Sequence, residues 1–322
     1  MNGDTLACVN PKQRLVPASN MKLVSTGLAL KHFGPDFRFT TTLAYSGQIV
    51  DSTLVGDLYI LGGGDPTIGS NSECARAAND TFGGWAAILR RAGITRIDGN
   101  VLGDPRFFND PSPDNMGASY EDIGTAYGTG PTGLCFFENQ QNFFVSPGSA
   151  VGLNVLMVPR YPDTPWMQYS CAARTGASKS TNTLYYVCTE FGPYGEVRGS
   201  FPIDRKGYTL ESANRFGAYT CAYYFWKYLN SNGLPAKGYG DVAPRGYIRT
   251  DLAFARTVGT YRGGQLEVAV PCRHSLRHQR TLRQLLCRDP LPHARKGRLR
   301  QHPAGLLPRG GEQGAQGLGN QS

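Results

Sequence analysis

A serine and a lysine three residues apart, Ser19 and Lys22, lie in the segment 17–23, which reads PASNMKL. We predict that a helix starts here. Positions i and i+3 of a helix share a face, so the lysine amine would lie beside the serine hydroxyl. A serine hydroxyl becomes a strong nucleophile when a neighbouring base accepts its proton. The N–H groups of a helix N-terminus also stabilise an oxyanion. The segment therefore predicts nucleophilic acyl transfer by Ser19, with Lys22 as the base.

The spacing of these two residues is weak evidence when it is taken alone. Serine and lysine are common, and about one chance match is expected in a chain of this length. The competing interpretation is a serine N-cap followed by a solvent-facing lysine in the first helical turn. The rest of the sequence has to decide between the two interpretations.

Three further segments make the serine motif more specific. Residues 56–67 (GDLYILGGGDPT) read as a short strand entering a glycine-rich turn, and residues 97–104 and 120–152 follow. Together with PASNMKL, these segments resemble the D-Ala-D-Ala carboxypeptidase/endopeptidase family, the class C low-molecular-mass penicillin-binding proteins. The resemblance runs from about Leu6 to about Tyr261.

The resemblance implies an α/β (α+β) fold class. It implies an incomplete transpeptidase domain of the penicillin-binding, β-lactamase-like type, with helices on an antiparallel sheet and a large β-rich insertion. We therefore expect four parts: the start of the transpeptidase-like domain in 1–43, the insertion in 44–245, a return to the first domain in 246–262, and a tail in 263–322.

Local patterns support the insertion independently of the resemblance. Residues 37–62 alternate apolar and polar side chains as strands do, and Gly and Pro recur through 100–245. Helices are predicted over Gly83–Ala92 and Ser212–Leu229. The second has an aromatic face that we interpret as core packing, made of Phe216, Tyr219, Tyr223, Phe225 and Tyr228. Gly62–Asp65 is interpreted as a tight turn, because no Gly-Lys-Ser/Thr follows as in a phosphate loop.

Composition limits the location and the chemistry of the chain. No run of eighteen apolar residues exists, so no transmembrane segment is expected, and the start at Met1 has neither the basic nor the apolar region of a signal peptide. The resemblance nevertheless implies a periplasmic or other extracytoplasmic location, so we expect an N-terminal truncation. The eight cysteines fit no zinc template. Cys171 and Cys188 would either close a hairpin as a disulfide or remain free buried thiols.

The last sixty residues differ from the rest in every compositional measure. Residues 263–322 contain ten Lys and Arg, three acids, four of the five histidines and none of the 35 aromatic residues. Their net charge is +7, whereas residues 1–262 carry +2. Such a segment cannot easily build a packed core. Either it is a basic, disordered tail that binds nucleic acid or an anionic surface, or it is translated in the wrong reading frame.

Back-translation favours the wrong reading frame. Residues 282–288 (LRQLLCR) with Asp289 are compatible with codons that read S-D-N-F-Y-A-E one nucleotide later. This product has the form of the family's second motif, S-x-N, so we place the frameshift near Tyr261–Gly264. Leu282 and Gln284 then occupy the positions of the motif's serine and asparagine and cannot replace them. The third motif, K-T-G, is absent from the sequence.

Two segments match the later motifs formally. Arg174–Gly176 is similar to K-T-G and Ser180–Asn182 matches S-x-N, but their order is reversed and they lie inside the expected insertion. We interpret both as parts of a turn rich in Ser, Thr and Asn. His32, at the end of the predicted serine helix, is interpreted as structural, because a cation near a helix C-terminus is favourable.

The resemblance implies a penicillin-sensitive, serine-type D-alanyl-D-alanine carboxypeptidase/endopeptidase. Ser19 and Lys22 would be its catalytic residues, peptidoglycan stem peptides its substrates and β-lactams its covalent inhibitors, with no metal, no organic cofactor and no nucleic acid partner. Because the second and third motifs are missing, we expect these 322 residues to be inactive. One alternative is a non-catalytic peptidoglycan-binding remnant, and another is a nucleic-acid binder that acts through the basic tail.

Overall fold

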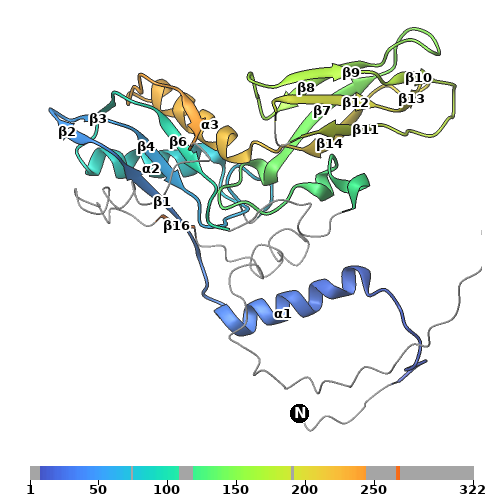
Figure 1. Cartoon of the computed structure of the whole chain (residues 1–322), viewed down its shortest axis with the longest axis horizontal. Helices are drawn as coiled ribbons and strands as arrows, with labels where there is room; N and C mark the ends of the chain where they lie inside the picture. Colours follow the sequence, from blue (N-terminus) through green and yellow to red (C-terminus); the bar gives the residue numbers. More distant parts are fainter. Residues whose placement is uncertain (1–7, 74, 109–118, 190–191, 244–265, 269–322) are drawn as a thin grey trace, which may run out of the picture. The chain divides into compact units, whose positions relative to one another are not determined.

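The computed structural model describes residues 8–73, 75–108, 119–189, 192–243 and 266–268, shown in colour in Figure 1. All of them belong to one compact unit, Met1–Arg288. They form helices and mixed sheets around two separate hydrophobic cores. The predicted α+β fold class is therefore confirmed.

The first core lies against a five-stranded sheet with the strand order β15-β6-β4-β1-β16. β4 pairs in parallel with β6, and β6 with β15, whereas β1 pairs antiparallel with β4 and with β16. The bounds are β1 Phe39–Tyr45, β4 Leu58–Leu61, β6 Val101–Asp104, β15 Gly240–Val242 and β16 Leu266–Val268. A smaller sheet contains β2 Gln48–Val50, β3 Thr53–Val55 and β5 Arg96–Ile97.

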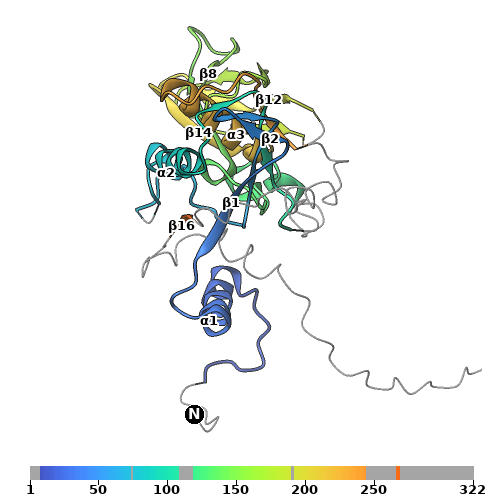
Figure 2. The same cartoon turned by 90° about the vertical axis from the view of Figure 1, so that its left-hand side faces the viewer.

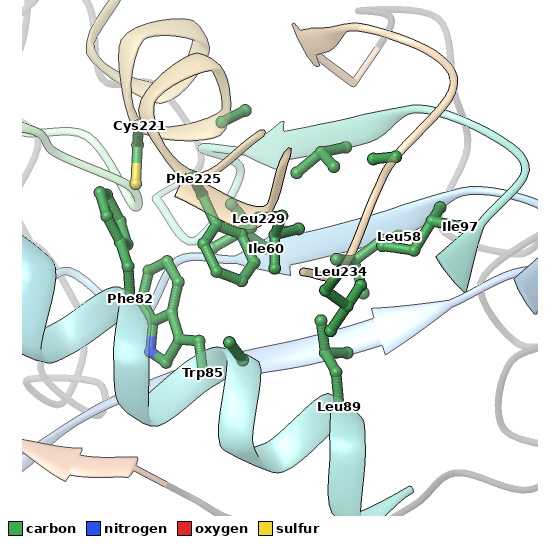
Figure 3. Packing of buried hydrophobic residues seen from close by; sticks show 14 of the residues in the cluster. Leu58, Ile60, Phe82, Trp85, Leu89, Ile97, Cys221, Phe225, Leu229 and Leu234 are labelled. Carbon is green, nitrogen blue, oxygen red and sulfur yellow. The ribbon is translucent and has the colours of Figure 1, made fainter. Parts of the chain in front are cut away.

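Two helices, α2 (Ala78–Arg91) and α3 (Gly217–Ser231), complete the first core. Figure 3 shows Phe82 and Trp85 of α2 facing Phe225 of α3, and these three rings lie 5.1–5.5 Å apart between centroids. Aromatic pairs at such distances stabilise a core beyond the area they bury. The packing of these rings therefore joins two helices that are far apart in the sequence.

The second core consists of strands that follow one another in the sequence. One sheet has the order β14-β7-β8 and another β11-β12-β9, and β10 pairs in parallel with β13. The bounds are β7 Gln140–Ser146, β8 Leu156–Tyr161, β9 Gln168–Cys171, β10 Arg174–Gly176, β11 Tyr185–Cys188, β12 Tyr194–Arg198, β13 Ser200–Pro202 and β14 Tyr208–Ala213. Short 3-10 turns precede β7 at Tyr120–Asp122, Ala126–Gly128 and Phe137–Asn139. This part of the predicted insertion is β-rich, as expected.

Both predicted helices exist, but their starts were placed wrongly. α2 begins at Ala78 rather than at Gly83. α3 begins at Gly217, because Ser212 belongs to β14, where it pairs opposite Gln141 of β7. Strand pairing over a distance in sequence therefore decides where β14 ends, and helical periodicity gave no signal of it.

Of the two alternatives for Cys171 and Cys188, the disulfide-closed hairpin is wrong. β12 lies between β9 and β11. Cys171 of β9 therefore pairs with Val197 of β12, and Cys188 of β11 pairs with Gly195 of β12. Both thiols are free. The sequence could not show that a later strand would enter between the two cysteine-bearing strands.

Within the described ranges, no helix is long and apolar enough to cross a membrane. Of the predicted tail, only the backbone of β16 is described, and it pairs with Phe39–Thr41 of β1. The other residues of 263–322, and the expected domain return at 246–262, lie outside the described residues.

Candidate active site

The segment that carries Ser19 forms the start of a helix, as predicted. A 3-10 turn spans Ala18–Asn20 and continues directly into α1 (Met21–Phe33), which Figures 1 and 2 draw in blue. The Asn20 N–H donates to the Pro17 carbonyl at 2.9 Å. Ser19 and Lys22 therefore lie on one continuous helical backbone, three positions apart, which is the arrangement the spacing required.

The backbone immediately before the serine is strained. Ala18 has φ +43°, in the left-handed region that non-glycine residues rarely adopt. Such a conformation costs about 1 kcal/mol or more, and it turns the chain sharply before Ser19. Strained backbone occurs preferentially at functional positions, so this turn is an independent reason to examine Ser19.

The two candidate side chains differ in exposure. Ser19 is exposed and Lys22 is half-buried. The Thr26 hydroxyl donates to the Lys22 carbonyl at 2.5 Å, and the Ser25 hydroxyl donates to the Met21 carbonyl at 2.9 Å. These bonds engage the carbonyls of the first turn, so that turn is fixed while the Ser19 hydroxyl faces solvent.

Apolar side chains of α1 are also exposed to solvent. Among the described residues of this helix only Ala29 is buried, whereas five large apolar side chains are exposed: Met21, Leu23, Val24, Leu28 and Leu30. A helix that is apolar around most of its circumference is normally surrounded by protein. The surface of α1 is therefore suited to burial by further polypeptide.

The end of α1 agrees with the interpretation of His32 as structural. Lys31 and His32 occupy the last turn, where a positive charge complements the helix dipole. Gly34 follows with φ +78°, and its N–H donates to the Leu30 carbonyl at 2.9 Å. A glycine in this conformation ends helices commonly.

The glycine-rich segment after β4, Gly62–Asp65, is not the tight turn that was predicted. It is a connection with a bend at Gly64, where the Gly62 N–H donates to the Asp104 carbonyl and the Gly64 N–H donates to the Gly133 carbonyl. A Cβ atom on Gly62 would lie 2.1 Å from the Gly133 carbonyl oxygen, and one on Gly63 would lie 1.9 Å from the Thr40 carbonyl oxygen. Neither position has room for a side chain. The two glycines therefore let the chain after β4 lie close to the backbone at Gly133 and at Thr40.

Asp65, at the end of this segment, is a buried carboxyl that the sequence did not single out. Its Oδ1 accepts hydrogen bonds from the Thr67 N–H at 2.8 Å and from the Thr67 hydroxyl at 2.7 Å. Its Oδ2 is buried and has no hydrogen-bond partner among the described residues. Burial raises the pKa of Asp65, and the bonds from Thr67 oppose that rise only in part.

The two formal motif matches are structural elements of the second core. Arg174–Gly176 is strand β10, so our interpretation of this segment as a turn is wrong. Ser180–Asn182 does lie in a loop, where the Ser180 hydroxyl donates to the Ala177 carbonyl and the Asn182 side chain accepts from the Leu184 N–H. Leu282 and Gln284, at the expected S-x-N positions, lie outside the described residues.

Comparison with known proteins identifies the family. The chain matches the D-Ala-D-Ala carboxypeptidase 3 (S13) family over residues 1–243, well over half of its length, and it belongs to that family. The D-alanyl-D-alanine carboxypeptidase of Actinomadura sp. (strain R39) is 26% identical over 286 residues, covering 84% of this chain and 48% of that protein.

Among solved structures, penicillin binding protein 4 (dacB) from Haemophilus influenzae aligns with a TM-score of 0.52 and 19% identity. The alignment covers 70% of this chain and 47% of that one. A structure of the same protein complexed with a novel β-lactam aligns with a TM-score of 0.48. The chain thus spans about half the length of the relatives it matches. The likeness in fold agrees with the resemblance that the sequence motifs indicated.

Proposed function

We propose that this chain carries the nucleophile of a serine-type D-alanyl-D-alanine carboxypeptidase/endopeptidase that acts on peptidoglycan outside the cytoplasmic membrane. One observation carries the proposal: the family match over residues 1–243 includes Ser19 and Lys22 at the first helical turn of α1. The sharp backbone turn at Ala18 supports the choice of Ser19.

The proposed reaction passes through an acyl-enzyme. Ser19 Oγ attacks the carbonyl carbon of the penultimate D-alanine while the Lys22 amine accepts the hydroxyl proton. The C–N bond then breaks, a proton passes to the leaving amine, and water hydrolyses the ester. The Ser19 N–H, at the start of the helical turn, would stabilise the tetrahedral oxyanion. A β-lactam would acylate the same hydroxyl through its strained amide, and the reaction requires no metal or organic cofactor.

We further propose that these 322 residues are inactive by themselves. Nucleophile and base alone leave a substrate unpositioned, and correct positioning contributes a large part of enzymatic rate enhancement. Leu282 has no hydroxyl for the role of the S-x-N serine, and Gln284 carries its amide one methylene farther from the backbone than the expected asparagine does.

Labelling with a fluorescent penicillin tests the proposal. We expect no stable covalent label on the 322-residue protein. We expect a label on the same protein after the reading frame is restored near Tyr261–Gly264, and its loss in that protein with Ser19→Ala. Label on the restored protein that survives Ser19→Ala would show that Ser19 is not the nucleophile. Stable, Ser19-dependent label on the 322-residue protein would contradict the proposed inactivity.

A non-catalytic peptidoglycan-binding remnant is the second candidate. It is favoured by the surface of the first core, where several tyrosine and tryptophan rings are only partly buried. Binding to purified sacculi without release of D-alanine would support this candidate.

A further inference from the structure

Five aromatic side chains beside α3 form a continuous row, here called the aromatic strip. Its members, in order of contact, are Tyr219, Trp166, Tyr223, Trp226 and Tyr239. Successive ring centroids lie 4.0, 5.2, 6.0 and 6.3 Å apart. Four of the five side chains are partly buried, and Tyr239 is 74% exposed. The strip is thus fixed by neighbouring protein and remains accessible to solvent.

The strip occupies a different face of α3 from the core residues. Cys221, Phe225 and Leu229 are fully buried in the first core, as Figure 3 shows. Tyr219, Tyr223 and Trp226 follow the spacing i, i+4, i+7 and lie on another side of the helix. The interpretation of the whole aromatic pattern as core packing is therefore right for Phe225 and incomplete for Tyr219 and Tyr223, which need a separate explanation.

Two ion pairs lie beside the strip. Asp163 Oδ2 lies 3.5 Å from Lys227 Nζ, and the Tyr223 hydroxyl donates to the same oxygen at 3.5 Å. Lys227 Nζ also lies 5.3 Å from the centroid of the Tyr223 ring, within the range of a cation–π contact. Lys237, next to the strip in sequence, is paired with Asp98 at 3.1 Å. Burial and then the negative charge of Asp241 raise the pKa of Tyr219 in the strip. The edge of the strip therefore offers hydrogen-bonding groups, and both of its lysines are paired with acids.

This combination favours a neutral sugar over other ligands. One face of a pyranose ring presents C–H groups that pack on aromatic rings, while hydroxyl and acetamido groups around its edge need donors and acceptors. Single-stranded nucleic acid also stacks on aromatic side chains, but its binding depends on unpaired basic groups along the backbone. Here both lysines have acidic partners. The strip contains only Tyr and Trp, which suit a ligand with apolar and polar sides.

We propose that the aromatic strip binds a linear oligosaccharide of N-acetylated amino sugars. The assignment of this glycan to the bacterial cell wall rests on the proposed function, whereas the binding chemistry depends on the strip alone. Such a site would hold the glycan strand while a peptide attached to it is presented elsewhere.

Tryptophan fluorescence of the full chain measures the proposed binding directly. Two of the three tryptophans, Trp166 and Trp226, lie in the strip, and Trp85 is buried in the core. Titration with N-acetylglucosamine hexamer is expected to give a saturable change in emission. Tyr239→Ala is expected to weaken this binding about tenfold, because it removes one stacking ring. Tyr127→Ala is the matched control, since Tyr127 is 72% exposed and is not part of the strip.

Each possible result is decisive. A saturable change that is weakened in Tyr239→Ala and retained in Tyr127→Ala supports the proposal. The proposal is overturned by the absence of a saturable change, by equal affinity of Tyr239→Ala and the unaltered chain, or by preferential binding of oligo-dT that weakens steeply with salt. Circular dichroism checks that each variant is folded. The hexamer contains no D-alanine, so failure of penicillin labelling and failure of glycan binding are separate results.

Discussion

Asp65 is buried, although a short connection rich in glycine usually lies at the surface. Its carboxyl is buried at the end of the glycine-rich segment, and among the described residues Oδ1 accepts hydrogen bonds whereas Oδ2 accepts none. Burial raises its folded-state pKa above the ordinary value of 3.8. The folded protein therefore binds this proton more tightly than the unfolded chain does. The free energy of unfolding therefore falls as pH rises from the ordinary pKa of Asp65 to its folded-state pKa. Above the folded-state pKa the loss is complete.

Replacement of Asp65 by asparagine should remove this loss. The side-chain amide in the Asp65→Asn variant would keep an oxygen for the Thr67 donors and would carry no charge at any pH. We expect the free energy of unfolding of the variant, minus that of the unaltered chain, to increase as pH rises through that window. Urea unfolding at a series of pH values measures the difference. A difference that does not vary with pH would show that Asp65 ionises in the folded protein as easily as in the unfolded chain.

Individual residues were predicted unequally well from the sequence. The helix that carries Ser19 and Lys22 was predicted from a local rule, the contact between positions i and i+3, and the catalytic role of the two residues stays a prediction. The burial of Asp65 could not be found in this way. It depends on the segment at Leu134, which forms a bridge with Asp65 and is distant from it in the sequence.

At the scale of elements, the connection after β4 depends on its glycines. Gly63→Ala would place a Cβ atom 1.9 Å from the Thr40 carbonyl oxygen of β1, so one strand would have to move. We expect a loss of about 1–3 kcal/mol in the free energy of unfolding, as for other overpacked sites.

Thermal unfolding with Gly27→Ala as the control measures this effect. Gly27 lies within α1, and a Cβ atom there would meet nothing within 4 Å. Alanine is favoured over glycine in a helix by about 1 kcal/mol, so this variant should unfold no more easily than the unaltered chain. Equal stability of the two variants would mean that the segment after β4 accommodates the added Cβ atom at position 63 without strain.

The elements were predicted better than their pairing. The helical patterns of α2 and α3 were visible in the sequence, but the start of α3 was not, because β14 pairs with β7 up to Ala213. The pairing of β12 between β9 and β11 was also missed. Local periodicity identifies a strand, whereas its neighbours are chosen by contacts between distant residues.

At the scale of the whole molecule, the chain divides by composition near residue 262. The family match ends at residue 243, and the basic segment without aromatic residues begins twenty residues later. A frameshift explains the change in composition without assigning a function to the basic segment. It remains a prediction.

Resequencing of the gene across the codons for Phe254 to Arg283, with several hundred bases on each side, checks the frameshift. We expect one inserted or deleted base near Tyr261–Gly264, and codons for Leu282–Arg288 that read S-D-N in the shifted frame. Other codons at those positions would exclude a frameshift. The basic segment would then be a genuine tail, to be examined for salt-dependent binding to DNA.

The order of strands in the five-stranded sheet also bears on how the chain acquires its structure during synthesis. β6 and β15 are hydrogen-bonded neighbours, yet every strand of the second core lies between them in the sequence. A ribosome therefore releases β1, β4, α2 and β6 long before α3 and β15, which complete the same core. The second core can close as soon as β14 emerges, since its strands are contiguous. The first core must wait, and until α3 arrives Phe82 and Trp85 are exposed to the cell's chaperones and to other nascent chains.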